Sequence, residues 1–385
     1  MITMLKILIL NTIGLDFEGI TNSITSYLEA TERSDMKIDF ALVSQNFHPE
    51  MLRIIREMGC GIHVLPLRMK ETFRYFLALR RLIKRNQYDI VHAHGNSTTL
   101  AIEMWAAKLA GCKVRIAHSR NTCTNYPRLN KLLRPLFNLS YTQGFACGIQ
   151  AGKWLFGNKD FRVIPNGKDI SKFAYNPNRR IELRTKLKLT GKVVIGHAGN
   201  FNYQKNHEYL IKIFKELACE DKHYVLYLIG EGSLRPQIEK MVEAYELEEQ
   251  VIFTGSISNM ADMLQAMDIM IFPSRFEGLP NVVLEWQIAC LPCVISDVIT
   301  KECKLTDLVT YMPLQEGPSA WAEKIRSIKI PDREKIKEGV LEQIQAAGFD
   351  IQENAKQLKE IYYKLVGGGD EINDGKSKSY HLYQQ

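Results

Sequence analysis

The chain lacks the long apolar segments that would place it inside a membrane. Among its 385 residues, no apolar run reaches the ~20 residues that a membrane-spanning helix requires. The apolar stretch near the start is short, and Asp16 and Glu18 follow it without a small-residue cleavage pattern, which is not typical of a signal peptide. The sequence therefore predicts a cytoplasmic protein whose residues 5–11 form a buried strand.

The cysteines lack the spacing of a disulfide framework or a zinc site. Eight are scattered along the chain, as expected for a protein that keeps them reduced. Cys290 and Cys293 form one Cys-x-x-Cys pair, but there is no second pair to complete a zinc site. The pair precedes a predicted strand, whereas a redox motif would open a helix. Neither cysteine is therefore predicted to carry chemistry.

Acidic residues are scarce in the first part of the chain. Residues 1–165 contain 22 Lys+Arg and 12 Asp+Glu, a net charge of +10, whereas the remainder carries −3. The basic residues gather in segments 68–85 and 113–135, which fits a contact with anionic lipid at the inner face of the plasma membrane. The alternative is the solvated basic face of an ordinary helix. Nucleic acid is not predicted as a partner, because no helix-turn-helix, zinc-finger or RNA-recognition signature is present.

What the chain does contain is a repeated alternation of apolar strand patterns and amphipathic helix patterns. Such alternation is typical of parallel β-α-β units and predicts an α/β fold. A segment with Pro, Asn and Gly at 162–173 separates two such series. The predicted strands are 5–11, 37–44, 61–67, 88–95 and 113–120 in the first series, and 192–200, 224–232, 250–257, 268–274 and 292–297 in the second.

This pattern predicts two doubly wound, Rossmann-like parallel-sheet domains, at residues 1–168 and 169–349. Residues 350–366 have the apolar spacing of an amphipathic helix. The tail 367–385 is polar and rich in glycine, which predicts disorder.

The segment "FEGLPNVVLE" contains two glutamates, Glu277 and Glu285, eight positions apart. Pro280 favours a helix start there, which places Glu277 in the preceding loop and Glu285 inside the helix. Gly278 allows a ligand to approach the backbone, and a helix N-terminus favours a phosphate or a polar sugar. The alternative is an ordinary helix with acidic residues near its start. A metal site is not favoured, because two carboxylates leave most ligands of a hard cation unsupplied.

These ten residues resemble the E-x7-E signature of retaining glycosyltransferases with the GT-B fold, of the family 4 type. Further stretches follow in the family's order: "VIPNGKDISKF", "IGHAGNFNYQKNHEYLIKIF", "YLIGEGSLRPQIE" and "VIFTGSISNMADMLQAMDIMIFPS". The resemblance covers nearly the whole chain. Within the family, the chain is similar to bacterial enzymes of exopolysaccharide, capsule and lipopolysaccharide synthesis. It implies two domains facing a cleft, with helix 350–366 crossing back onto the first domain.

The resemblance implies a hexosyltransferase that uses a nucleotide-diphosphate sugar, such as a UDP-sugar, and retains the anomeric configuration. The donor would bind the second domain and a growing glycan or lipid-linked acceptor the first. No cofactor and no bound metal are expected. Two alternatives remain: a nucleotide-sugar epimerase of the same fold, and a degenerate protein that binds sugar nucleotides without catalysis.

The resemblance also assigns roles to residues of the second domain. Glu277 would contact hydroxyls of the donor sugar, Glu285 the ribose, and the backbone of Gly278 and Leu279 the sugar or diphosphate. Lys205 would neutralise the diphosphate as it leaves. The remaining donor-binding residues are Asn200, Gly230 and Gly255. Asn200 departs from the family, which usually has Arg there, and an amide cannot neutralise a diphosphate as a guanidinium does.

In the first domain, "HSRNT" matches the family's H-S-x-N-T, so His118 is expected to reach the donor sugar and joins Lys205 and Glu277 as a catalytic residue. Gly19, His94 and Asn96 are expected on the acceptor side. The alternatives are a turn glycine at Gly19 and structural histidines at both histidine positions. Family members usually have Gly where Cys290 stands, at a helix end.

Overall fold

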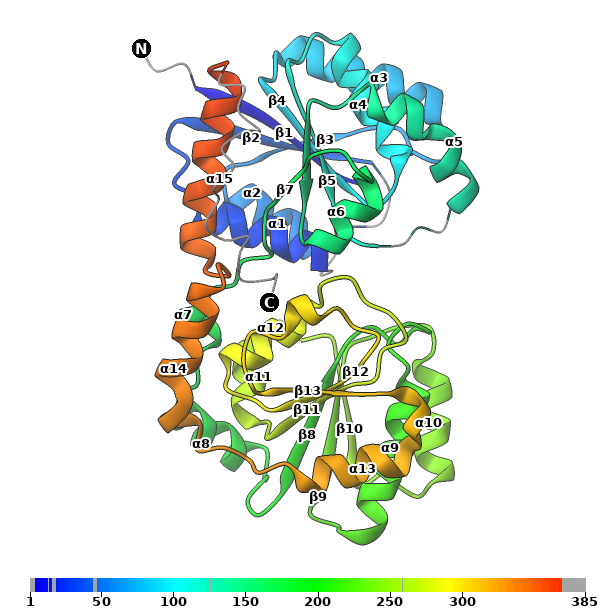
Figure 1. Ribbon diagram of the computed structural model, residues 1–385, viewed down its shortest axis with the longest axis vertical. Coiled ribbons are helices and arrows are strands. Elements are labelled where there is room, and N and C mark those ends of the chain that lie inside the picture. Colours follow the sequence, from blue (N-terminus) through cyan, green and yellow to red (C-terminus); the bar gives the residue numbers. More distant parts are fainter. Residues whose placement is uncertain are drawn as a thin grey trace. The chain divides into compact units, whose positions relative to one another are not determined.

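The computed structural model describes residues 4–12, 14–15, 19–43, 47–122, 124, 126–257 and 259–368 (Figure 1). The chain forms two compact units. The first extends to Gly167 and resumes at Gly348, and the second is Lys168–Ala347. The sequence pattern placed the first boundary one residue later, after 168. Residues 369–385 of the predicted disordered tail lie outside the described residues.

The first unit contains a seven-stranded parallel sheet with strand order β3-β2-β1-β4-β5-β6-β7. Its strands are β1 Leu5–Asn11, β2 Met36–Leu42, β3 Gly61–Val64, β4 Ile90–Gly95, β5 Val114–Ser119, β6 Gln143–Ala146 and β7 Arg162–Val163. The order reverses between β1 and β4, so the carboxyl ends of these two strands form the topological switch point where ligands bind in doubly wound sheets.

Helices cover both faces of this sheet. Alternate residues of β1 serve the two faces: Ile7 and Ile9 belong to one core cluster, Leu8 and Leu10 to the other. The first cluster packs under α1 Gly19–Ala30, α2 Pro49–Glu57 and α15 Ile351–Val366. The second packs under α3 Thr72–Asn86, α4 Ala101–Leu109, α5 Pro127–Asn138 and α6 Ile149–Phe156, with the 3₁₀ turn η1 Thr98–Leu100 before α4.

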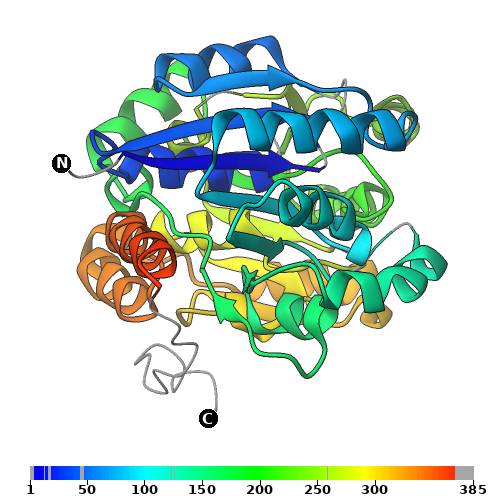
Figure 2. The same cartoon turned by 90° about the horizontal axis from the view of Figure 1, so that it is seen from above.

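The helix α15, red in Figures 1 and 2, is part of the first unit although it ends the described chain. It packs against α1. Its buried residues Ile351, Ala355, Leu358 and Tyr362 recur at helical spacing and join the core beneath α1. The Nζ of Lys359 donates to Asp35 Oδ1 at 2.8 Å, which ties the exposed side of the helix to the same unit.

The second unit contains a six-stranded parallel sheet with strand order β10-β9-β8-β11-β12-β13. Its strands are β8 Val193–Ala198, β9 Tyr224–Ile229, β10 Val251–Gly255, β11 Ile269–Phe272, β12 Cys293–Ser296 and β13 Val309–Met312. The helices are α7 Ile170–Phe173, α8 Pro177–Lys186, α9 His207–Glu220, α10 Arg235–Ala244, α11 Met260–Ala266, α12 Asn281–Ile288, α13 Gly317–Ser327 and α14 Arg333–Ala346, with 3₁₀ turns η2 Lys301–Cys303 and η3 Leu314–Glu316. Here the order reverses between β8 and β11.

Cys290 ends α12 in a left-handed conformation, with φ of 57°. Its N–H donates to Gln287 O at 2.8 Å, and the N–H of Leu291 donates to Trp286 O at 2.9 Å. This pair of bonds is the Schellman motif, in which glycine is the usual left-handed residue. Cys290 therefore occupies a glycine position at a helix end, as the resemblance implied. Cys293, also free and buried, begins β12.

No helix in the part of the chain that the structure describes combines the length and apolar character that crossing a bilayer requires.

Candidate active site

Lys205 and Glu277 meet at the switch point of the six-stranded sheet. Lys205 lies in the loop after β8 and Glu277 in the loop after β11, the two strands between which the order reverses. The Nζ of Lys205 is 2.7 Å from Glu277 Oε1, and the side chains are 16% and 8% exposed. The ammonium also lies 4.4 Å from the centre of the Phe272 ring, which favours a cation. The sheet thus brings together two of the three predicted catalytic residues.

Glu285 forms a second ion pair with Lys168. The Nζ of Lys168 is 2.5 Å from Glu285 Oε1, with side chains 8% and 12% exposed. Glu285 lies in the second turn of α12, and Lys168 opens the second unit. The two glutamates of the E-x7-E segment are therefore both held by lysines, in an environment that is largely closed to solvent. Such pairs hold a carboxylate in one orientation, because moving away would leave a charge without its partner.

The loops after β8 and β9 pack backbone against backbone. Gly230 has a φ of +141°, and a Cβ there would lie 2.3 Å from the carbonyl oxygen of Gly199. The N–H of Gly230 donates to Gly255 O at 3.0 Å, which links the end of β10 to the same loops. Gly230 and Gly255 thus set the shape of these loops, and Asn200 lies exposed in the loop after β8.

Buried polar atoms lie beside Lys205. Nε2 of His197 and both ring nitrogens of His207 are buried and make no hydrogen bond to a described residue. Burial is the main cause that lowers the pKa of His197 to about 4 and that of His207 to about 2, and the charge of Lys205 contributes to both values. Both rings are therefore neutral at physiological pH, so that Lys205 carries the positive charge of this part of the site.

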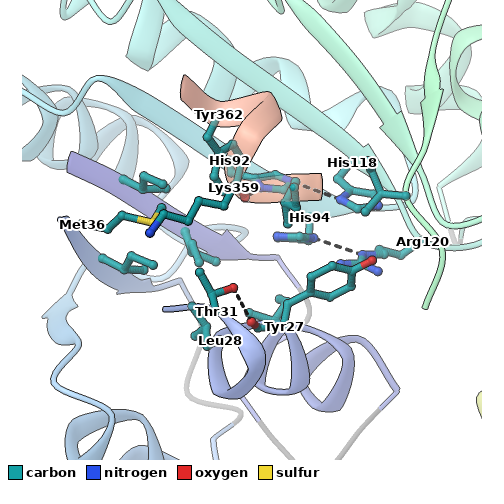
Figure 3. A pocket seen from close by; sticks show the side chains of 16 residues that line it. Tyr27, Leu28, Thr31, Met36, His92, His94, His118, Arg120, Lys359 and Tyr362 are labelled. Carbon is teal, nitrogen blue, oxygen red and sulfur yellow. Dashed lines mark hydrogen bonds between the residues drawn. The ribbon is translucent and has the colours of Figure 1, made fainter. Parts of the chain in front are cut away.

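Three buried histidines gather in the first unit (Figure 3). His92 Nε2 lies 3.0 Å from His118 Nδ1, and His92 Nδ1 lies 2.7 Å from the hydroxyl of Tyr362 on α15. His94 Nδ1 accepts from Arg120 Nε at 3.0 Å. Burial is the main cause that lowers the pKa of each histidine well below its usual range. The charge of Arg120 adds to it for all three, and neighbouring histidine rings add to it for His94 and His118.

These rings line a cavity of about 30 Å³ between the sheet and helices α1 and α15. That volume has room for about two water molecules.

The three histidines are the one group in the described part of the chain with metal-ligand proximity, since their donor atoms lie within 4.8 Å of one another. The chemistry around them does not fit a cation. Both ring nitrogens of His92 already have hydrogen-bonding partners, and the positive Arg120 holds the Nδ1 of His94. The expectation of a metal-free enzyme stays a prediction.

Two family models match the chain in its two halves. "Glycosyltransferase Family 4" matches residues 17–172, and "Glycosyl transferases group 1" matches residues 192–328. The "Putative glycosyltransferase EpsF" of Bacillus subtilis (strain 168) is 31% identical over 364 residues, which cover 91% of this chain and 94% of EpsF. The chain belongs to this glycosyltransferase family.

A more distant relative and a solved structure also match most of the chain. The Escherichia coli "UDP-Gal:alpha-D-GlcNAc-diphosphoundecaprenol alpha-1,3-galactosyltransferase" is 27% identical over 322 residues, 77% of this chain and 80% of that enzyme. The crystal structure of Anabaena HepE in complex with UDP-glucose has a TM-score of 0.75 at 17% identity, and covers 93% of this chain and 99% of HepE. At that identity the likeness shows the fold alone. The two parallel sheets are those of the GT-B fold, as predicted.

The glycosyltransferase signature thus maps onto defined positions of the second unit. Gly278 and Leu279 lie half-buried in the loop before α12. Pro280, expected as an early helical residue, is instead the N-cap, and the helix begins at Asn281. The first turn of a helix carries partial positive charge, which is consistent with the prediction of a phosphate or sugar site here.

The predicted residues of the first unit are more dispersed. His94 and His118 lie in one cluster, with ring centroids 4.9 Å apart. Gly19 is exposed at the first position of α1. Asn96 is half-buried after β4, and its carbonyl accepts from Trp154 Nε1 at 2.8 Å. His118 is buried, so its expected contact with the donor sugar stays a prediction.

Sequence reasoning missed Lys168 and Arg120. Both residues lie in motifs of the family. Lys168 is part of "VIPNGKDISKF", the segment between the two domains, and Arg120 is part of "HSRNT", in which only His118 was assigned a role. The available signal was position, because Arg120 directly follows a predicted strand, where ligand-binding residues of parallel sheets concentrate.

Proposed function

We propose that the protein transfers a hexose from a UDP-sugar or similar nucleotide-diphosphate sugar to a lipid-linked or growing glycan, with retention and without a metal or cofactor. The observation that carries the proposal is the pair of ion pairs Lys205–Glu277 and Lys168–Glu285 at the carboxyl edge of the six-stranded sheet. Both glutamates of the signature are present, oriented and nearly enclosed. The UDP-glucose bound to HepE supports this choice of donor.

In this proposal Lys205 stabilises the leaving group. The bond between the anomeric carbon and the β-phosphate oxygen breaks, and its electron pair stays on the phosphate. The acceptor hydroxyl oxygen bonds to the anomeric carbon, and its proton passes to the departing diphosphate. The ammonium of Lys205, held 2.7 Å from Glu277, needs only to exchange one oxygen partner for another to meet that charge. Preoriented charges that face a developing negative charge supply a large part of enzymatic rate enhancement. Glu277 then accepts hydrogen bonds from hydroxyls of the sugar.

Glu285 binds the ribose in this proposal. Its carboxylate has acceptor positions beyond the one that Lys168 occupies, so it receives a ribose hydroxyl without giving up the ion pair. Asn200, in place of the usual arginine, leaves Lys205 with most of the diphosphate charge.

The acceptor is proposed to be lipid-linked, in exopolysaccharide or capsule synthesis, with the protein in peripheral contact with the cytoplasmic membrane surface. The acceptor in the printed name of the E. coli relative is a diphosphoundecaprenol sugar. In the first unit, Phe73 on α3 and Leu132 on α5 are 74% and 73% exposed, and both helices are rich in Lys and Arg. Exposed apolar side chains among basic ones favour binding to anionic lipid.

The test of the donor site is a thermal-unfolding panel with UDP-glucose, UDP-galactose, UDP-N-acetylglucosamine and GDP-mannose. A bound donor raises the unfolding midpoint by mass action, and Glu285→Ala should abolish the rise. Sugar transfer is followed as label that enters the lipid extract of bacterial membranes. If none of these donors raises the midpoint and none is consumed, the proposal is wrong. Conversion of donor without acceptor would instead identify an epimerase.

The membrane proposal has its own test, co-sedimentation with vesicles of phosphatidylglycerol and phosphatidylcholine. The wild type should bind and be released by high salt, and the variant Lys84→Glu/Arg85→Glu should bind weakly. Lys335→Glu/Lys337→Glu on α14 of the second unit serves as a charge-matched control and should bind as wild type. Equal binding by both variants would remove the assignment of this surface.

A further inference from the structure

Arg120 directly follows β5, at the carboxyl edge of the seven-stranded sheet. Its guanidinium is held on three sides, and Figure 3 shows it beside His94. Nε donates to His94 Nδ1 at 3.0 Å, and Nη1 donates to Asn166 Oδ1 at 2.7 Å and to Ser23 Oγ at 3.2 Å. The guanidinium therefore has one fixed orientation, which residues from β4, α1 and the segment after β7 determine.

All three of these partners are neutral. Burial keeps His94 and its neighbours uncharged, and among the described residues no carboxylate forms an ion pair with Arg120. Burial also lowers the pKa of Arg120 itself. A partly buried charge without a counter-charge is costly, and proteins otherwise pair such groups with a carboxylate. Arg68 in the same unit shows the usual solution, since it pairs with buried Glu103 at 2.7 Å.

The geometry leaves one nitrogen of Arg120 available. A guanidinium has five N–H donors, and the contacts above use those on Nε and Nη1. Nη2 makes no hydrogen bond within the described part of the chain. Two N–H groups on a rigidly held cation with no carboxylate partner among the described residues are suited to the oxygens of a phosphate, for which arginine is a favoured side chain.

We propose that the first unit binds a phosphate group at Arg120, and that this phosphate belongs to the diphosphate of a lipid-linked acceptor. The assignment of this phosphate to the acceptor rests on the proposed function, in which the acceptor is lipid-linked. The three neutral histidines orient the guanidinium through His94 without adding a competing charge. The diphosphate of the donor has the same chemistry, so the experiment has to separate the two sources.

The experiment is calorimetric titration of inorganic pyrophosphate into the full chain, both alone and saturated with UDP. With UDP bound, the phosphate-binding groups of the donor site are occupied, and the remaining pyrophosphate binding reports the site at Arg120. Loss of a charge-assisted hydrogen bond predicts that Arg120→Met binds pyrophosphate about 10- to 100-fold more weakly. Arg53→Met is the matched control, because Arg53 is an exposed arginine of the same unit and already pairs with Glu50. It should bind as wild type.

A second variant separates binding from structure. Asn166→Asp places a carboxylate beside Nη1 of Arg120 and supplies the missing counter-charge without removing the arginine. We expect it to weaken pyrophosphate binding at least tenfold while the unfolding midpoint stays equal or rises. A purely structural Arg120 would give a different result, namely lower midpoints in Arg120→Met with unchanged pyrophosphate binding.

The outcomes distinguish the two proposals. Weaker pyrophosphate binding by both Arg120→Met and Asn166→Asp in the presence of UDP supports the acceptor site. If Arg120→Met weakens the binding of UDP but not that of pyrophosphate, the phosphate is that of the donor and the assignment to the acceptor is overturned. Wild type that binds no pyrophosphate, or variants that bind it equally, overturn the site at Arg120. Failure of UDP itself to bind counts against the proposed function, and the titration without UDP still decides the question of Arg120.

Discussion

Replacement of Lys168 by methionine tests whether the second ion pair positions Glu285. The substitution keeps most of the side-chain volume and removes the ammonium 2.5 Å from a carboxylate that is only 12% exposed. Removing one partner of a fully buried pair costs about 3–5 kcal/mol, because the other charge remains without compensation. Since roughly a tenth of each side chain still meets solvent, we expect Lys168→Met to lower the unfolding free energy of the second unit by about 2–3 kcal/mol.

The assay is a double-mutant cycle of Lys168→Met, Glu285→Gln and the double variant. Urea unfolding is monitored through the hydrogen exchange of peptides from β11 and α12, which report the second unit alone. The double variant should recover most of the loss, because it no longer contains an unpaired carboxylate. The matched control is Lys335→Met: Lys335 is 82% exposed and pairs with Asp332, and its loss should cost less than about 1 kcal/mol.

The binding of UDP and of its analogues tests whether Lys168→Met also disturbs the predicted contact between Glu285 and the ribose. Lys168→Met should weaken the binding of UDP, whereas analogues without the 2′- and 3′-hydroxyls should be affected little. Additive effects in the cycle, together with an equal loss for UDP and its dideoxy analogue, would refute the assignment of Lys168 as the residue that orients Glu285.

Three further results are expected. Lys205→Met should lower kcat by about 10²–10³-fold with a smaller change in donor affinity, and steady-state kinetics with a nucleotide sugar will separate the two. The buried histidines His92, His94 and His118 have lowered pKa values, so the first unit should keep its full stability above pH ~6.5 and lose it as the pH falls below that, because the unfolded chain binds protons first. Each contributes at most about 1.4 kcal/mol per pH unit, so His118→Asn should reduce the pH slope of urea-unfolding free energies by about that amount; an unchanged slope would contradict neutral burial. Cys290→Gly should be more stable than Cys290→Ala by about 1 kcal/mol in thermal unfolding, because only glycine accepts φ of 57° without strain; equal stability would mean that the backbone there carries no strain.

The sequence predicted the fold because its signals are local. Apolar strands, Pro and Gly punctuation and helical spacing each lie within about ten residues, and their order specifies a doubly wound sheet. Lys205 and Glu277 were both assigned to the donor site through the resemblance, and each follows a predicted strand, where ligand-binding residues of parallel sheets concentrate. The helix end at Cys290 was predicted through the resemblance, because the family usually has glycine there, whereas its left-handed conformation is known only from the structure.

The remaining contacts could not be predicted because their partners are far apart in the chain. Lys168 and Glu285 are separated by 117 residues, and His92 and the Tyr362 hydroxyl by 270. No periodicity relates such positions; they meet only after two sheets have formed. That Arg120 has no carboxylate partner among the described residues is harder still to foresee, because composition shows many basic residues without indicating which of them meet an acid in the folded chain.

The return of α15 to the first unit has a consequence for how the protein is made. Leu358 and Tyr362 fill the core beneath α1, so one face of the seven-stranded sheet stays incomplete until the last helix has been synthesised. The second unit, Lys168–Ala347, is continuous in sequence and has all its residues available earlier. On the ribosome we therefore expect the second unit to complete its core first, and the first unit to keep apolar surface exposed until α15 has been synthesised.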